Sequence, residues 1–243
     1  YEWKKHTTNL IDTPGDQNFF SDTRSCLQAA DGVVVVIDAV DGIKVQTEQA
    51  WDFAAEFNQP SVIFINKLDR ERADFSRTFQ EAVEIFKPKP IILQLPIGTE
   101  AEFRGVVDLI SGQAFEYDEN GKAQKIEIPA DMQESVDTEK ENLIENIAEA
   151  DDELVERYLE GETLTEKELA AALRKGTLAR IFVPVVCGSA TRNIGIDLLM
   201  NLIVDALPSP ADQGAKTGID PATEKNVERM PDPEAPFSGF VVK

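Results

Sequence analysis

The sequence has few of the residues that commonly bind metals. It holds one histidine, His6, and two cysteines, Cys26 and Cys187, which lie far apart and without the spacing of metal ligands. A histidine- or cysteine-based metal site is therefore not expected. Two unpaired thiols are typical of buried or neutral cysteines in a reducing compartment, so we expect a cytoplasmic protein.

Long apolar runs are also lacking. The longest uncharged apolar stretch, residues 32–37, has the length of a strand and falls far short of the roughly 18 residues that a transmembrane helix needs. We therefore expect no contact with a membrane. The chain begins at Tyr1 and shows no signal-peptide pattern, which predicts that it is part of a longer protein.

Positive charge is scarce. The chain carries 24 Lys and Arg against 45 Asp and Glu, which gives a net charge of −21. Proteins bind nucleic-acid phosphates mainly through Lys and Arg. This charge balance therefore excludes a protein that binds a nucleic-acid backbone over its whole surface. Any contact with RNA must be local or made by other parts of the protein.

The sequence does contain alternating apolar and amphipathic segments. With 243 residues, of which 42% are hydrophobic, one or two domains can form. Short apolar runs predict strands at residues 8–12, 33–38, 61–66 and 181–187, and amphipathic periodicity predicts helices at 22–30, 45–57, 74–86 and 194–206. This order predicts an α/β fold with a mainly parallel sheet. Its ligand should lie beyond the carboxyl ends of the strands, which are marked by Asp12, Asp38, Asn66 and Gly188.

The pattern changes between residues 88 and 178. Antiparallel strands are expected at 91–95, 106–109, 114–117 and 125–128, and helices at 131–149, 151–159 and 165–175, with a capping box from Thr165 to Glu168. We therefore divide the chain into a core of residues 1–87 and 179–210, an inserted α+β subdomain of residues 88–178, and residues 211–243. The proline-rich stretch 208–236 predicts a linker, and 237–243 predicts the first strand of another β domain.

Asp12, Thr13, Pro14 and Gly15 follow the first predicted strand. In phosphoryl-transfer sites, a carboxylate at a strand end holds Mg²⁺, and an unhindered glycine N–H can bind the terminal phosphate. Asp12 is thus the candidate metal ligand. The same four residues also form ordinary turns, so this motif alone leaves both interpretations open.

A second motif, Asn66-Lys67-Leu68-Asp69, closes another strand. The Asp69 carboxylate can accept both N–H groups of a guanine edge, and the stem of Lys67 can cover the flat base. A base without those donors would leave Asp69 unpaired, which gives selectivity. The alternative is a helix cap with a surface charge.

Gly188, Ser189 and Ala190 follow a third strand. Small residues let backbone N–H groups approach a base oxygen, although a plain turn from strand to helix would look the same. The three motifs occur in this order, each at the end of a strand. Together they predict a guanine-nucleotide site.

With these motifs in place, the sequence resembles the GTPase domain of translational elongation factor G. Besides the three motifs, the matching stretches are residues 30–39, 66–74, 94–98, 105–110, 158–162, 174–177 and 204–210. The 118 residues between Asp69 and Gly188 exceed what one helix and strand need, and an insert at this place separates factor G from factor Tu. The class-3 release factor shares the first two motifs, but the insert fits factor G better.

The resemblance implies a P-loop-NTPase-like sheet, an α+β insert and the start of a β-barrel domain. It implies GTP or GDP and Mg²⁺ as ligands, the ribosome as partner, a monomer, and GTP hydrolysis coupled to translocation. An elongation factor G paralogue for ribosome recycling with altered hydrolysis is one alternative. A non-catalytic, acidic ribosome- or protein-binding module is the other.

Two departures qualify the resemblance. The motif G-x-x-x-x-G-K-[ST] is absent and is expected upstream of Tyr1 together with the first switch, so we expect weak nucleotide affinity for this chain alone. The family carries a catalytic His directly after D-T-P-G, where this chain has Asp16. An acidic side chain there predicts slow or differently triggered hydrolysis. Alternatively, Asp16 caps the next turn.

The insert is strongly acidic. Residues 127–175 carry 16 acidic and five basic side chains, a net charge of −11. The simplest interpretation is solvated helix faces. The resemblance implies a sharper one, in which Glu141, Glu145 and Glu149 steer the basic stalk protein of the large ribosomal subunit. Contacts with ribosomal RNA would then fall mainly to parts of the protein outside this chain.

Overall fold

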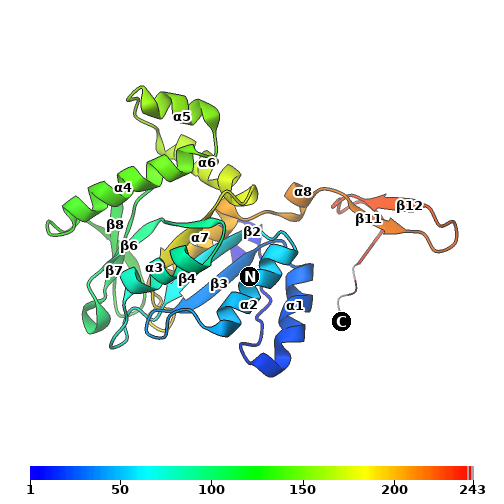
Figure 1. Ribbon diagram of the computed structural model, residues 1–243, viewed down its shortest axis with the longest axis horizontal. Helices are drawn as coiled ribbons and strands as arrows, with labels where there is room; N and C mark the ends of the chain where they lie inside the picture. Colours follow the sequence, from blue (N-terminus) through cyan, green and yellow to red (C-terminus); the bar gives the residue numbers. More distant parts are fainter. Residues whose placement is uncertain (240, 242–243) are drawn as a thin grey trace.

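The computed structural model describes residues 1–239 and 241. A four-stranded parallel sheet with the strand order β3-β4-β10-β5 forms its centre (Figure 1). The strands are β3 (Val33–Asp38), β4 (Ser61–Asn66), β10 (Phe182–Cys187) and β5 (Lys89–Ile92). The predicted α/β fold with a parallel sheet is therefore confirmed, and three of these strands match the predicted ranges to within one residue.

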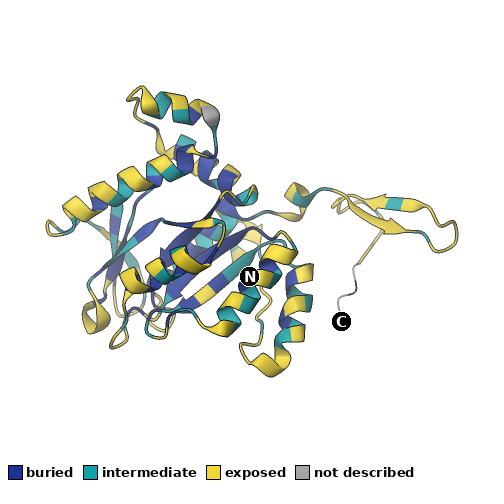
Figure 2. Cartoon of the chain, in the orientation of Figure 1, coloured by how far each residue is buried: buried dark blue, intermediate teal, exposed yellow. Residues whose placement is uncertain are grey.

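Helices cover both faces of the sheet, which is dark blue and buried between them in Figure 2. They are α1 (Phe20–Ala29), α2 (Val45–Glu56), α3 (Phe75–Ile85) and α7 (Ile196–Ala206). Because strand side chains alternate between faces, Ile63 packs in the apolar cluster with residues of α2 and α3, whereas Val62 packs in the cluster with residues of α7. Asp74 begins α3 by accepting a hydrogen bond from the Arg77 backbone N–H at 2.9 Å.

The insert consists of an antiparallel sheet and three helices. The sheet has the strand order β6-β7-β8-β9, so its strands are neighbours in the order of the chain. Its elements are β6 (Gln94–Ile97), β7 (Gly105–Asp108), β8 (Gln113–Tyr117), β9 (Ala123–Ile126), α4 (Gln133–Ala148), α5 (Asp152–Leu159) and α6 (Glu166–Leu178). The capping box between Thr165 and Glu168 at the start of α6 is confirmed.

The prediction of a single antiparallel strand over residues 91–95 is wrong. The run splits into β5, which pairs parallel with β10, and β6, which pairs antiparallel with β7. An uninterrupted apolar run does not reveal where one sheet ends and the next begins, because each of the two strands contributes buried residues. As a result Ile91 of the central sheet and Leu143 of α4 share one apolar cluster. The division of the chain at residues 88 and 178 stays a prediction.

The predicted strand at residues 8–12 is also wrong. This segment is irregular, and Leu10 and Ile11 are 74% and 50% exposed. A strand needs a hydrogen-bonded neighbour, and this segment joins neither the central sheet nor any other. The short hairpin β1 (Glu2–Trp3) and β2 (His6–Thr7) comes just before it, and Trp3 Nε1 donates to Asn201 Oδ1 of α7 at 2.9 Å.

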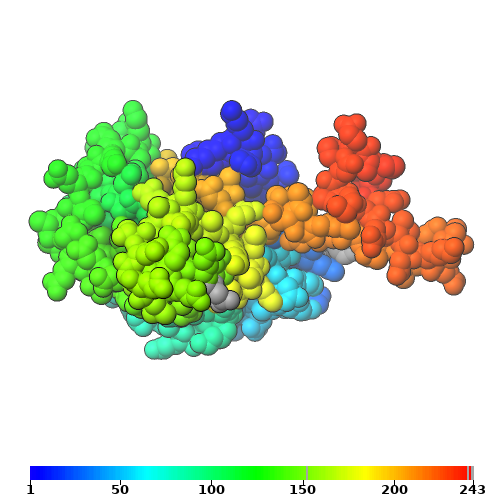
Figure 3. All heavy atoms as spheres, turned by 90° about the horizontal axis from the view of Figure 1, so that it is seen from above, coloured from blue at the N-terminus to red at the C-terminus, as the bar shows by residue number. Residues whose placement is uncertain are grey.

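The carboxyl-terminal part projects from the body of the molecule (Figures 1 and 3). It contains α8 (Pro210–Gln213) and an exposed hairpin of β11 (Lys216–Ile219) and β12 (Asn226–Arg229), where the sequence predicted a linker. Of the strand predicted at 237–243, residues 240, 242 and 243 lie outside the described residues, and the remainder is not a strand. Among the described helices, none is long and apolar enough to cross a bilayer.

Candidate functional site

The carboxyl ends of three parallel strands bring two of the sequence motifs together. Asp38 at the end of β3 is paired in register with Asn66 at the end of β4. On the other side of β4, the Gly188 N–H donates to Ile65 O at 3.0 Å, and the Leu68 N–H donates to Gly188 O at 3.3 Å. The backbone therefore joins the Asn66–Asp69 motif directly to the loop that contains Ser189 and Ala190.

The side chain of Asn66 strengthens this connection. Its Oδ1 accepts hydrogen bonds from the N–H of Lys67 at 2.8 Å and from the N–H of Ala190 at 2.9 Å, although Ala190 lies 124 positions further along the chain. Lys67 has a φ of 66°, which turns the chain sharply out of the strand. Asn66 thus fixes the relative position of two predicted base-binding segments.

Asp69 has an unused acceptor. Its side chain is half-buried, and within the described structure its Oδ1 atom is buried without any hydrogen-bond partner. Leaving a buried acceptor unpaired costs about 1–3 kcal/mol, so such an atom indicates a missing donor. The edge of guanine presents two adjacent N–H donors, which fit a carboxylate. The residues present therefore fit a guanine base.

The loop after β10 closes on itself. Ser189 and Ile194 exchange backbone hydrogen bonds of 3.0 Å in both directions, and the Ser189 hydroxyl lies 3.2 Å from the Thr191 hydroxyl. A Cβ atom at Gly188 would lie 2.2 Å from Ile194 O, so this close approach requires glycine. Ser189 is buried, whereas Ala190 is exposed.

An ion pair that the sequence did not reveal lies beside these residues. Lys67 Nζ contacts Asp38 Oδ2 at 2.5 Å. Burial opposes ionisation of Asp38, but the hydrogen bonds from Lys67, Val40 N–H and Asp41 N–H outweigh it and lower the pKa of Asp38. Lys67 and Asp38 are 29 residues apart, and no spacing rule relates them.

The residues predicted to contact phosphate are held less firmly. Asp12 and Gly15 are exposed and Thr13 is half-buried. Apart from Gly15 and its two chain neighbours, no described residue has an atom within 4 Å of the position that a Cβ of Gly15 would take. Pro14 O accepts a hydrogen bond from the Thr23 hydroxyl at 3.2 Å, which ties this segment to α1. The structure thus leaves Asp12, Pro14 and Gly15 open to solvent and Thr13 partly so.

Asp16 caps a short helical turn. It precedes the 3₁₀ helix η1 (Gln17–Phe19), and its Oδ1 accepts hydrogen bonds of 2.8 Å from both the backbone N–H and the side-chain amide of Asn18. The capping role was one of the two alternatives that the sequence left open. A catalytic role of this position stays a prediction.

No cluster of three or more His, Cys, Asp or Glu side chains suited to a metal occurs among the described residues. This arrangement does not conflict with Mg²⁺, because Mg²⁺ is commonly held by one or two carboxylates together with water and substrate phosphates. Asp12 could supply one such carboxylate.

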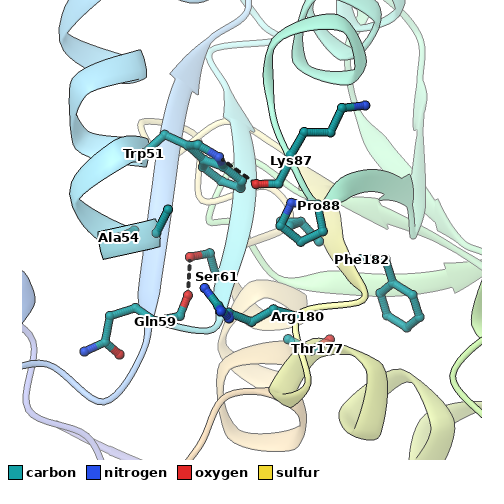
Figure 4. A pocket seen from close by; sticks show the side chains of 11 residues that line it. Trp51, Ala54, Gln59, Ser61, Lys87, Pro88, Thr177, Arg180 and Phe182 are labelled. Carbon is teal, nitrogen blue, oxygen red and sulfur yellow. Dashed lines mark hydrogen bonds between the residues drawn. The ribbon is translucent and has the colours of Figure 1, made fainter. Parts of the chain in front are cut away.

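Two cavities lie away from the carboxyl ends of the strands. One, of about 20 Å³, is at their amino ends, where Trp51 Nε1 donates to Lys87 O and Ser61 Oγ donates to Gln59 O (Figure 4). It has room for a single water molecule. The other, of about 280 Å³, lies in the insert between Ile110, Lys140 and Leu164. Neither includes a residue of the three motifs.

Sequence reasoning missed the bonds between the insert and residues on either side of the third motif. Gln94 Oε1 accepts a hydrogen bond from Cys187 N–H at 3.2 Å, and the Tyr117 hydroxyl donates to Asp197 Oδ1 at 2.6 Å. The partners are 93 and 80 residues apart. A local motif could not have indicated them.

Comparison with known proteins agrees with the geometry. A family model described as the elongation factor Tu GTP binding domain matches residues 1–209. The crystal structure of a protein from Thermus thermophilus is similar, with a TM-score of 0.81 and 30% sequence identity. This match covers 93% of the present chain and 35% of the Thermus chain, so the present chain spans well under two thirds of that protein's length. Because the family model matches most of the chain, the chain belongs to the translation-factor family of elongation factor Tu-type GTP-binding domains.

Proposed function

We propose that the base of GTP or GDP binds at Asn66, Lys67, Asp69, Ser189 and Ala190. The observation that carries this proposal is the buried, unpartnered Oδ1 of Asp69, three positions after the side chain that joins both base-binding segments. Guanine would supply two donors to Asp69, and its 6-oxo group would replace Asn66 Oδ1 as the acceptor of the Ala190 N–H.

The phosphate end of the nucleotide would bind at residues 12–15. Asp12 would hold Mg²⁺ and the Gly15 N–H would meet the terminal phosphate, which is supported by the open space at Gly15 and by the exposure of Asp12. When bound, Mg²⁺ neutralises phosphate charge. Hydrolysis of GTP is proposed for the full-length protein, with Asp16 at the position where the family has histidine.

For the full-length protein we propose a role like that of elongation factor G, in the cytoplasm and as a monomer, with hydrolysis coupled to ribosomal translocation. The resemblance of the insert supports this choice over other translation factors. A recycling paralogue and a non-catalytic binding module are the alternatives. The acidic residue Asp16, at the position where the family has histidine, makes the recycling paralogue with altered hydrolysis the second candidate.

The ribosomal partner at the insert would be a basic stalk protein. Glu141, Glu145 and Glu149 are all exposed, on α4 or directly after it, as an electrostatic docking face requires. Such a face raises the rate of encounter with a basic partner, and salt weakens it.

The test of the base site is Asp69→Asn in the full-length protein, with the binding of GDP and of xanthosine diphosphate measured by calorimetry. Asparagine can accept only one of the two guanine donors and carries no charge, so we expect GDP affinity to fall about 100-fold. Xanthine carries an oxygen in place of the 2-amino group, and the asparagine amide can donate to it. Xanthosine diphosphate should therefore bind the variant more tightly than GDP does.

Asp74→Asn is the matched control. Asp74 caps α3 in the same part of the chain, and asparagine is an equally good cap, so the fold and the GDP affinity should persist. If Asp69→Asn binds GDP as the unmodified protein does, Asp69 does not contact the base and the proposed site is wrong.

A further inference from the structure

The loop of residues 188–195 is held by the insert as well as by its own backbone. Arg192 Nη1 donates to Phe103 O at 2.7 Å, and Asn193 Nδ2 donates to Gly121 O at 3.3 Å. Both acceptors belong to turns of the insert: Phe103 follows the 3₁₀ helix η2 (Glu100–Glu102), and Gly121 lies in the turn between β8 and β9. Two neighbouring loop side chains therefore reach two separate turns of the insert.

The insert also holds both ends of this loop. Before the loop, Gln94 Oε1 accepts the hydrogen bond of Cys187 N–H, and Gln94 is almost fully buried. After the loop, the buried Tyr117 donates to Asp197 in the first turn of α7. Burial first, and then the hydrogen bond to Asp197, raise the pKa of Tyr117, so its hydroxyl remains a donor across the physiological range.

The backbone of the same loop carries the group that would meet the base. Ala190 N–H bonds to Asn66 Oδ1 on the inner side, and the Arg192 N–H bonds to Ser189 Oγ at 3.4 Å. Within four residues, the Ala190 N–H bonds to Asn66, and the side chains of Arg192 and Asn193 bond to the insert. A shift of the anchors would therefore move Ala190.

We infer that the insert sheet positions the Ala190 N–H, with Arg192 and Asn193 as positioning residues. This N–H donates to Asn66 Oδ1 in the structure, and the guanine 6-oxo group would replace Asn66 Oδ1 as its acceptor when the base binds. The inference rests on the base site proposed above. It gives the insert a part in nucleotide selectivity that is separate from any docking of a partner on its helices.

Gly121 shows how closely the insert approaches the loop. A Cβ atom built there would lie 2.5 Å from the Asn193 Cβ atom, and the φ of Gly121 is +72°. Gly161 has a similar φ of +82°, but its Cβ would meet nothing within 4 Å. Alanine therefore strains the backbone at both positions, whereas it displaces Asn193 only from position 121. The two glycines form a matched pair for a test.

The experiment compares two nucleotides in the full-length protein: GDP and the diphosphate of 2-aminopurine riboside, which keeps the 2-amino group but lacks both the 6-oxo group and the N1–H donor. For Arg192→Ala and Gly121→Ala, we expect GDP affinity to fall about three- to tenfold, as for the loss of one hydrogen bond. Affinity for the 2-aminopurine nucleotide should change less than about twofold, because it does not use the Ala190 N–H. Arg192→Lys, which can still donate to Phe103 O, should recover part of the loss.

Gly161→Ala should leave both affinities unchanged, and thermal unfolding of every variant monitors the fold. Equal weakening of both nucleotides would show a general structural effect and overturn the inference, as would unchanged GDP affinity in Arg192→Ala and Gly121→Ala. If the unmodified protein binds the two nucleotides equally well, the proposed base contacts with Ala190 and Asp69 fail instead. The experiment therefore distinguishes a failure of the positioning role of the insert from a failure of the proposed base site.

Discussion

The base-binding and phosphate-binding parts of the proposed site differ in what holds them. The base part, residues 66–69 and 188–195, is fixed by backbone bonds to β4 and β10, by Asn66 and by the insert. The phosphate part, residues 12–16, belongs to no sheet and is mostly exposed. A motif at the end of a paired strand is held in place by the hydrogen bonds of the sheet. The same kind of motif after an unpaired segment lacks this support.

The largest expected difference in stability between the two parts concerns two asparagines. Asn66→Ala leaves the N–H groups of Lys67 and Ala190 without their acceptor, so we expect the free energy of unfolding to fall by about 1–2 kcal/mol in urea titrations. Asn9→Ala, in the exposed segment that leads to the phosphate part, should change it by less than about 0.5 kcal/mol. Equal losses of unfolding free energy in the two variants would show that the base part is held no more firmly than the phosphate part.

Two capping aspartates give a smaller contrast. Asp74 caps the 11-residue helix α3, and Asp16 caps the three-residue η1. Asp74→Ala should cost about 1 kcal/mol of unfolding free energy, the usual value for an α-helix cap. Asp16→Ala should cost less than about 0.5 kcal/mol, because it releases only one short exposed turn. Chemical denaturation of both variants measures the contrast, and a cost at Asp16 as large as that at Asp74 would show that residues 12–16 are firmly folded.

The sequence predicted those parts of the structure that depend on local patterns. Three of the central strands, the helices and the Thr165 capping box follow from apolar periodicity and short-range hydrogen bonds. Residues 8–12 and 91–95 were predicted wrongly because pairing decides whether an apolar run forms one strand, two strands or none. The same holds for the site: the motifs were visible in the sequence, whereas the contact of Arg192 with Phe103 joins residues 89 positions apart and forms only when the insert folds.

The smallest expected effect concerns the ion pair between Lys67 and Asp38 in the base part. The pKa of Asp38 in the folded chain lies below its ordinary value of 3.8, so the pair stabilises the fold above that pH and loses its contribution as the pH falls through the lowered pKa. Because Lys67 is half exposed, Lys67→Met should cost on the order of a few tenths of a kcal/mol at pH 6.

This deficit should shrink as the pH falls below 3.8, because protonated Asp38 no longer attracts Lys67 in either state of the chain. Lys225→Met, at an exposed position of the carboxyl-terminal hairpin, is the control and should show no such trend. Unfolding free energies of both variants at about pH 6 and about pH 3 provide the measurement. A Lys67→Met deficit that stays constant or grows as the solution is acidified would mean that the methylene stem of Lys67, and not its charge, stabilises this part of the molecule.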